Sequence, residues 1–145
     1  NYFHKEIDNV VKQGIKINIL GEINGLPSDL KKILIKCENL TKTNKNINVN
    51  LAINYGAKNE ILMAVKKSKK LSMKNLEKNL YTKNMPNPEI LIRTGGNQRL
   101  SNFMLWQLAY TELFFLKKLW PDLKSTDLKN IIKKFKSIKR NYGAI

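Results

Sequence analysis

The sequence predicts an α/β fold in which a mostly parallel central sheet is flanked by helices. Apolar runs typical of strands alternate along the chain with amphipathic helical patterns. The segment between the first two runs is long enough for a helical crossover, which makes these strands parallel and their connection right-handed. Because 145 residues with 42% hydrophobic content can bury one core, we expect residues 1–145 to form a single α/β domain.

The first half of the chain has the pattern of a βαβ unit. The opening residues, "NYFHKEIDNVVKQG", are amphipathic and predict a helix, and the runs "GIKINIL" and "INVNLAI" that follow predict strands from Gly14 and from Ile47. Between these runs, "LPSDLKKILIKCENLTK" predicts a helix with Ser28 as its N-cap. One face of this helix is apolar and consists of Leu30, Ile33, Leu34, Cys37 and Leu40.

The second half continues the alternation of helices and strands. Helical patterns run from about Lys58 to Lys67 and from about Met73 to Tyr81, and "NMPNPE" then breaks the chain. The run "EILIR" predicts a third strand, and "STDLKNIIKKFKSIKR" predicts a closing amphipathic helix. The apolar positions of this last helix are Leu128, Ile131, Ile132, Phe135 and Ile138.

Composition excludes several classes of protein. A single Cys37 rules out an internal disulfide framework, and Cys37 with the lone His4 offers no zinc cluster, so a metal would need oxygen ligands. No apolar run approaches the roughly 20 residues that cross a bilayer. The first residues also lack the apolar core of a secretory signal. We therefore expect a soluble chain.

The net charge of +16 invites a nucleic-acid interpretation, because basic domains attract polyanions. Only three of the 27 basic residues are Arg, however, and the many Lys are spread along the chain together with Asn. This pattern favours a solvated Lys-rich surface. Contact of runs such as "KKSKK", Lys66 to Lys70, with anionic lipid headgroups or phosphates is the alternative.

The loop "RTGGNQRLS" concentrates two of the three Arg around a Gly-Gly turn. Arg93 ends the predicted third strand, and ligands of open α/β sheets bind at the carboxyl ends of strands. The two glycines allow a tight turn, while Arg99 and Ser101 follow on its far side. Guanidinium groups, a hydroxyl and free backbone N–H groups together suit a phosphate or diphosphate. The alternative is a surface turn with an incidental Arg pair; a P-loop motif is absent from the sequence.

Glu112 is the carboxylate that stands inside the apolar run "WQLAYTELFFLKKLW". Burying an isolated carboxylate is costly unless a cation or hydrogen bonds compensate. A Mg²⁺ ion held by one or two carboxylates and by substrate phosphates would supply that compensation. The alternative is that Glu112 faces solvent at the end of a strand.

Taken in order, these residues resemble a known family. The stretch "PEILIRTGGNQRLSNFMLWQLAYTELFFLKKLWPDL", Pro88 to Leu123, resembles the C-terminal signature of cis-prenyltransferases, the undecaprenyl diphosphate and dehydrodolichyl diphosphate synthase family. "GEINGLP" at Gly21 and "NYGAKNEI" at Asn54 are similar to the family motifs "GDxSxLP" and "NYGGRxEI". The resemblance therefore covers nearly the whole chain.

The resemblance implies an enzyme that extends an allylic diphosphate, usually farnesyl diphosphate, with isopentenyl diphosphate units. Each condensation forms a cis double bond and releases diphosphate with the help of Mg²⁺, and the growing chain lies in an apolar tunnel. The long-chain polyprenyl diphosphate product would serve dolichol- or undecaprenol-type lipid carriers. The family also implies a homodimer or a heterodimer with a related subunit. It suggests a place in the cytoplasm or at the surface of the endoplasmic reticulum or another organelle membrane, with no nucleic-acid partner.

The resemblance also implies roles for individual residues of this chain. By matching position, Glu112 would help to hold Mg²⁺, and Arg140 would be a candidate for contacting the partner's diphosphate across a dimer. The isopentenyl diphosphate would be bound by Arg93, Arg99 and Ser101, on a loop supported by Gly95, Gly96 and Asn97.

Several positions depart from the family pattern. Asn97 stands where the family usually has Glu, while Ala57 and Lys58 replace the second Gly and the Arg of "NYGGR". The final "KRNYGAI" resembles the family terminus "RRFGG", but one Arg position of that motif is taken by Asn. In this last motif Arg140 and Gly143 match, Tyr142 replaces Phe, and Asn141 replaces Arg.

Two family motifs have no counterpart in the sequence. Nothing resembles "MDGNGRWA", whose loop binds the allylic diphosphate and whose Asp completes the metal site, or "FSxENWxRP", which supplies catalytic side chains. We therefore expect the chain to match the C-terminal two-thirds of a family member, to lack the first strand and the allylic-diphosphate loop, and to be inactive alone. No catalytic residue is assigned within it. Two alternatives are a non-catalytic partner subunit, and a basic module that binds nucleic acid or a membrane surface.

Overall fold

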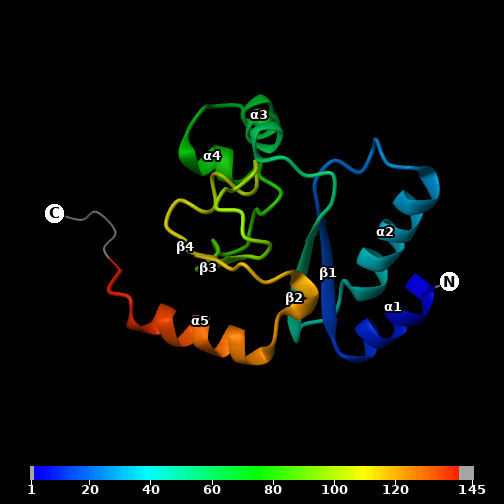
Figure 1. Ribbon diagram of the computed structural model, residues 1–145. Helices are drawn as coiled ribbons and strands as arrows, with labels where there is room; N and C mark the ends of the chain where they lie inside the picture. Colours follow the sequence, from blue (N-terminus) through cyan, green and yellow to red (C-terminus); the bar gives the residue numbers. More distant parts are fainter. Residues whose placement is uncertain (1, 141–145) are drawn as a thin grey trace. The chain divides into compact units, whose positions relative to one another are not determined.

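The computed structural model describes residues 2–140 and divides the chain into two compact units, the first reaching to Lys83 and the second beginning at Asn84 (Figure 1). The prediction of a single domain stays a prediction. The first unit contains α1 (Tyr2–Lys12), β1 (Ile15–Leu20), α2 (Ser28–Thr41), β2 (Ile47–Ala52), α3 (Ala57–Lys67) and α4 (Met73–Glu77). The second unit contains β3 (Ile90–Arg93), β4 (Glu112–Phe115), the 3₁₀ turn η1 (Trp120–Asp122) and α5 (Ser125–Ser137).

The strands form two parallel pairs, which confirms the α/β class. β1 pairs with β2 in a register that runs from Ile15 opposite Ile47 to Leu20 opposite Ala52. β3 pairs with β4 from Ile90 opposite Glu112 to Arg93 opposite Phe115. The sequence predicts one parallel sheet; in the described residues its strands form two separate two-stranded parallel sheets. The strand β4 was not predicted as a separate element.

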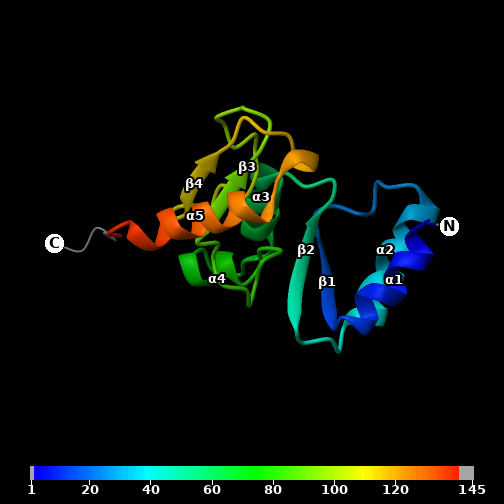
Figure 2. The ribbon, with the colours of Figure 1, turned by 60° about the horizontal axis from the view of Figure 1, so that its bottom comes forward.

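Helix α2 closes the edge of β1 that faces away from β2. The N–H group of Ile17 donates to the hydroxyl of Thr41 at 3.0 Å, and the N–H group of Ile19 donates to the carboxylate of Glu38 at 2.7 Å. Because alternate residues of a strand point their backbone groups to opposite edges, these two bonds satisfy an edge that would otherwise be open for pairing. Figures 1 and 2 show α1 and α2 side by side against this strand pair.

The apolar face predicted for α2 is only partly buried. Leu34 and Cys37 lie in the core, and burial raises the pKa of the Cys37 thiol. Leu30 and Leu40, which flank them, are 37% and 46% exposed. The buried stripe is therefore narrower than the sequence suggests.

Two predicted element boundaries are wrong. Ser28 is not the N-cap of α2: Pro27 takes that position with an extended backbone, and Ser28 already belongs to the helix, so its hydroxyl does not cap. Helix α4 ends at Glu77 rather than near Tyr81. Beyond it the chain forms short turns, because the N–H groups of Asn79 and Leu80 bond to carbonyls three residues back.

The two early family motifs meet at the carboxyl ends of β1 and β2. Glu22 and Asn54 exchange hydrogen bonds, from the Glu22 N–H to the Asn54 carbonyl at 3.3 Å and from the Asn54 side-chain amide to the Glu22 carbonyl at 2.8 Å. Gly21 has a φ of +125°, and a Cβ at this position would lie 2.2 Å from the carbonyl oxygen of Ile53. Any other residue at position 21 would therefore force these strand ends apart.

A buried carboxylate organises the rest of the first unit. Glu60 in α3 is 1% exposed and accepts hydrogen bonds from the Tyr55 hydroxyl at 2.5 Å and from the Tyr81 N–H at 2.8 Å. The rings of Tyr55 and Tyr81 also contact each other edge to face. Glu60 thus joins the loop after β2 to the turn after α4.

No helix among residues 2–140 is both long enough and apolar enough to cross a bilayer. Asn141, Tyr142 and Gly143, which complete the predicted C-terminal motif, lie outside the described residues.

We predict that Glu60→Ala lowers the free energy of unfolding by about 3 kcal/mol, because two part-buried donors lose their buried acceptor. Urea denaturation of the variant and of the unmodified chain would measure the change. Glu6→Ala removes an exposed Glu and is the matched control, with a midpoint close to that of the unmodified chain. Equal midpoints for Glu60→Ala and Glu6→Ala would contradict the organising role of Glu60.

Candidate functional site

The candidate site lies at the carboxyl end of β3, where the Gly-Gly turn begins. Gly95 and Gly96 have φ values of +87° and +76°, a region that glycine adopts without strain. Their N–H groups donate to the carbonyls of Lys118 at 2.8 Å and Leu116 at 2.9 Å. The turn forms as predicted, but these two N–H groups are engaged within the chain, so they are not free for a ligand as the sequence suggested.

The segment after β4 that supports this turn is itself fixed to α5. The ammonium group of Lys118 lies 2.7 Å and 2.9 Å from the two carboxylate oxygens of Asp127, and the Lys124 N–H donates to the same carboxylate at 2.9 Å. The hydrogen bond from Lys118, followed by that from Lys124, holds the pKa of Asp127 below its usual value. A chain of contacts therefore runs from the start of α5 to the Gly-Gly turn, and sequence reasoning missed it.

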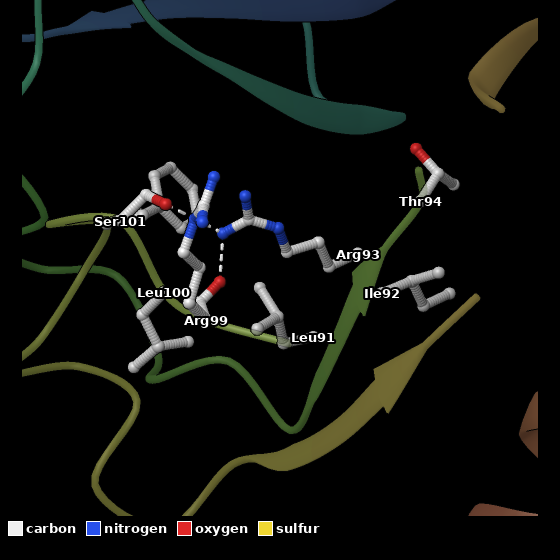
Figure 3. A pocket seen from close by; sticks show the side chains of 8 residues that line it. Leu91, Ile92, Arg93, Thr94, Arg99, Leu100 and Ser101 are labelled. Carbon is white, nitrogen blue, oxygen red and sulfur yellow. Dashed lines mark hydrogen bonds between the residues drawn. The ribbon is translucent and has the colours of Figure 1, made fainter. Parts of the chain in front are cut away.

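Arg93 reaches from the strand to the loop that follows the turn. Its Nη1 donates to the carbonyl oxygen of Arg99 and, at 3.0 Å, to the hydroxyl of Ser101. Figure 3 shows the Arg93 guanidinium pointing toward both residues. The structure thus brings together the three residues that the sequence predicts to bind a diphosphate.

These residues border a cavity of about 370 Å³. Its lining residues carry two guanidinium groups and two hydroxyls, those of Ser101 and Thr94, and none of them carries a carboxylate. The Arg99 side chain is exposed and makes no hydrogen bond or ion pair with any residue in the described part of the chain. The apolar part of the wall was not predicted from the sequence. The apolar run of β3, which contributes Leu91 and Ile92, could have indicated it. The lining residues are Leu91, Ile92, Arg93, Thr94, Arg99, Leu100, Ser101 and Phe103.

The arrangement suits an anion that carries a short hydrocarbon group. Arg is well matched to phosphate oxygens, and its charge is not lost at any ordinary pH. The apolar side chains beside the two Arg would contact a hydrocarbon and exclude water from it. Asn97, on the predicted supporting loop, is exposed in the turn.

Glu112 lies at the other end of the strand pair. It begins β4 opposite Ile90, whereas Arg93 ends β3, so about 10 Å of strand separates the two levels at ~3.3 Å per residue. Its carboxylate is half-buried and makes no hydrogen bond or ion pair within residues 2–140. Among the described side chains, no three His, Cys, Asp or Glu are grouped to hold a metal ion. One carboxylate fits Mg²⁺ only if other ligands, such as substrate phosphates, complete the shell.

Arg140 also lies at the amino end of β3. Its guanidinium donates to the Glu89 carboxylate at 3.3 Å and to the Tyr110 carbonyl at 3.0 Å, and it lies 5.3 Å from the centre of the Phe135 ring. Arg140 and Glu89 both line a second cavity, of about 230 Å³. The structure thus does not bring Arg140 close to Arg93. Contact of Arg140 with a partner's diphosphate stays a prediction, and it would require Arg140 to give up its ion pair with Glu89.

Comparisons with known proteins show the family to which this chain belongs. A family model described as "Putative undecaprenyl diphosphate synthase" matches residues 1–143. The isoprenyl transferase of Clostridium tetani is 36% identical, over 100% of this chain and 61% of the relative. The isoprenyl transferase of Aquifex pyrophilus is also 36% identical, over 99% of this chain and 64% of the relative. The chain therefore spans about three-fifths of the length of these curated relatives.

Two solved structures share the fold. A probable undecaprenyl diphosphate synthase from Campylobacter jejuni superposes with a TM-score of 0.88 at 32% identity, covering 98% of this chain and 69% of the other. A lavandulyl diphosphate synthase from Lavandula x intermedia, solved in complex with dimethylallyl diphosphate, gives 0.90 at 30% identity, covering 99% and 67%. With the family model matching almost every residue, the chain belongs to the undecaprenyl diphosphate synthase family of cis-prenyltransferases.

Proposed function

We propose that this protein takes part in cis-prenyl chain elongation, in which isopentenyl diphosphate is condensed onto an allylic diphosphate such as farnesyl diphosphate. The product would be a long-chain polyprenyl diphosphate for a dolichol- or undecaprenol-type lipid carrier. The observation that carries the proposal is the cavity at the end of β3, which combines two guanidinium groups and the Ser101 hydroxyl with an apolar wall. Isopentenyl diphosphate has the same two parts, a diphosphate and a five-carbon hydrocarbon.

In this proposal Arg99 and Arg93 bind the diphosphate, and Ser101 donates a hydrogen bond to it. Leu91, Leu100 and Phe103, which line the same cavity, would contact the hydrocarbon. Holding the diphosphate and the hydrocarbon together fixes the direction in which the double bond points. A fixed orientation lowers the entropic part of the barrier to condensation.

Glu112 is proposed as a Mg²⁺ ligand that acts together with phosphate oxygens of the substrate. Its half-buried carboxylate lacks a cationic partner among the described residues, and Mg²⁺ is commonly bound by one or two carboxylates plus phosphates. When bound, Mg²⁺ would screen the charge of the isopentenyl diphosphate phosphates. The diphosphate that departs would be the one of the allylic substrate.

We further propose that this chain binds isopentenyl diphosphate without completing the condensation by itself. None of its residues matches the family motif that binds the allylic diphosphate or the motif that supplies catalytic side chains. Mg²⁺-dependent polyprenyl synthesis by the purified 145-residue chain would contradict this part of the proposal.

We predict that Arg99→Ala weakens the binding of isopentenyl diphosphate roughly 10- to 100-fold, because a hydrogen bond to a charged group contributes about 1.5–3 kcal/mol. Isothermal titration calorimetry at fixed ionic strength would measure the dissociation constants. Lys129→Ala removes an exposed cation of α5 and is the matched control, with little expected change. An equal loss in both variants would show that net charge, not this cavity, attracts the ligand.

We predict that Glu112→Gln abolishes the gain in isopentenyl diphosphate affinity that Mg²⁺ provides and leaves the metal-free affinity nearly unchanged. The substitution keeps the size of the side chain and removes its charge. Titrations with and without Mg²⁺ would separate the two effects, with Glu6→Gln as a control on the first unit. A normal Mg²⁺ response in Glu112→Gln would exclude Glu112 as the ligand.

A further inference from the structure

We propose that the segment joining α3 to α4, residues 66–74, docks on an anionic lipid surface, with its Lys side chains at the headgroups and two apolar side chains inserted between them. The segment contains none of the residues that line the cavity at the end of β3. This inference therefore goes beyond the proposed function and does not rest on it.

The first observation is that the 66–74 segment carries charge of one sign. Its nine residues include no Asp or Glu and five Lys, which are Lys66, Lys67, Lys69, Lys70 and Lys74. All five Lys are exposed, and none forms an ion pair within the part of the chain that the structure describes. A Lys held close to an anionic membrane strengthens binding, and neighbouring Lys act together. The segment therefore suits a surface of anionic headgroups.

The second observation is that two apolar side chains of the same segment are exposed to solvent. Leu71 is 70% exposed and Met73 is 71% exposed, while Ser72 between them accepts a hydrogen bond from the Asn75 N–H at 3.3 Å. Exposed apolar residues scattered singly are ordinary, but here two of them stand within three residues and have Lys on both sides.

This combination distinguishes a bilayer from a nucleic acid as the partner. Phosphates of a nucleic acid would engage the Lys side chains and leave Leu71 and Met73 in water. The interface of an anionic bilayer takes up both kinds of side chain, because the headgroups attract the Lys and the acyl boundary accepts the apolar groups. The lipid surface is therefore the partner that uses the whole segment.

The third observation is that the segment is fixed to the helices on either side of it. Figure 1 shows it as an arc that joins α3 to α4. The Ser68 hydroxyl donates to the Ala64 carbonyl at 2.8 Å, and the Asn75 side-chain amide donates to the Lys70 carbonyl at 2.9 Å. The Asn79 amide donates to the Ser68 hydroxyl at 3.2 Å. The arc is thus formed before it meets a membrane, and less conformational entropy is lost on docking.

A second surface with exposed apolar side chains lies in the other unit and provides a comparison. Leu119 and Trp120 are exposed ahead of the Lys-rich helix α5. Asp122 and Asp127 follow them, however, and Asp127 pairs with Lys118. Carboxylates beside an apolar site are repelled by anionic lipid, so the 66–74 segment is the better docking site of the two.

The test is co-sedimentation of the 145-residue chain with phosphatidylcholine vesicles that contain either no phosphatidylserine or about one-third of it. We expect binding to the mixed vesicles and at least about tenfold weaker binding to pure phosphatidylcholine. Replacing Lys69 and Lys70 together by Ala should weaken binding to the mixed vesicles roughly 25-fold, because each Lys near the surface contributes about fivefold. The matched control replaces Lys129 and Lys133 of α5 by Ala, with an expected change below about threefold.

The apolar contribution is tested separately. Replacing Leu71 and Met73 together by Ser should weaken binding to the mixed vesicles about tenfold or more, because the two side chains no longer enter the interface. Trp120→Ser removes an exposed apolar side chain of the second unit and is the matched control, with little expected change. Binding of a single-stranded oligonucleotide should be the same in the Leu71→Ser, Met73→Ser variant and in the unmodified chain. Urea midpoints would confirm that all variants are folded.

Three results would overturn the inference. Equal losses in the Lys69, Lys70 variant and in the Lys129, Lys133 variant would show that net charge alone attracts the vesicles. Unchanged vesicle binding after the loss of Leu71 and Met73 would show a site for any polyanion, nucleic acid included. Failure of the unmodified chain to bind the mixed vesicles would exclude docking, and none of these results bears on the diphosphate site.

Discussion

The parallel register of β3 and β4 sets the distance between the side chains that are proposed to bind one ligand in the second unit. It sets Arg93 opposite Phe115 at the carboxyl end and Ile90 opposite Glu112 at the amino end. Both segments that leave the carboxyl end then lie close enough for the Gly-Gly turn to bond to the residues after β4. The anion site is built on this junction, and Glu112 begins the pair about 10 Å away along the strand, a separation that a Mg²⁺ ion bound to substrate phosphates would have to bridge.

Rigidity at this junction comes from polar groups that are satisfied within the unit. Asp127 holds Lys118, whose carbonyl holds the Gly95 N–H, and Arg93 holds the loop that carries Ser101. A site of this kind is largely formed before its ligand arrives. Less conformational entropy is then lost on binding. The first unit follows the same principle, with Glu60 serving the loop after β2 in the way that Arg93 serves the loop after β3.

Much of the fold could be predicted because its strands and helices carry clear periodic patterns. The order of the elements apart from β4, the parallel pairing of the first two strands and the grouping of Arg93 with Arg99 and Ser101 all followed from the sequence pattern. The strand β4 was not predicted because "ELFF" has only four residues and is apolar after Glu112, without the alternation that marks a half-buried strand. The cap at Ser28 failed because its backbone is already helical.

Other features depend on contacts between distant residues and could not be predicted. No local pattern shows that Nη1 of Arg93 is used by the Arg99 carbonyl, or that Glu89 and Tyr110 engage Arg140. The distance along the strand between Glu112 and Arg93 likewise depends on a register that only the paired strands reveal. The sequence therefore indicates which residues border the cavity, but not which of their polar groups form hydrogen bonds within the chain.

The central claim is that the carboxyl end of β3 holds the diphosphate. A crystal structure of this chain with isopentenyl diphosphate would test it most directly. The account predicts the diphosphate against Arg99 and the Ser101 hydroxyl, with the bond from Arg93 to Ser101 intact. A diphosphate bound instead beside Arg140, or on the Lys-rich surface of α5, would contradict it.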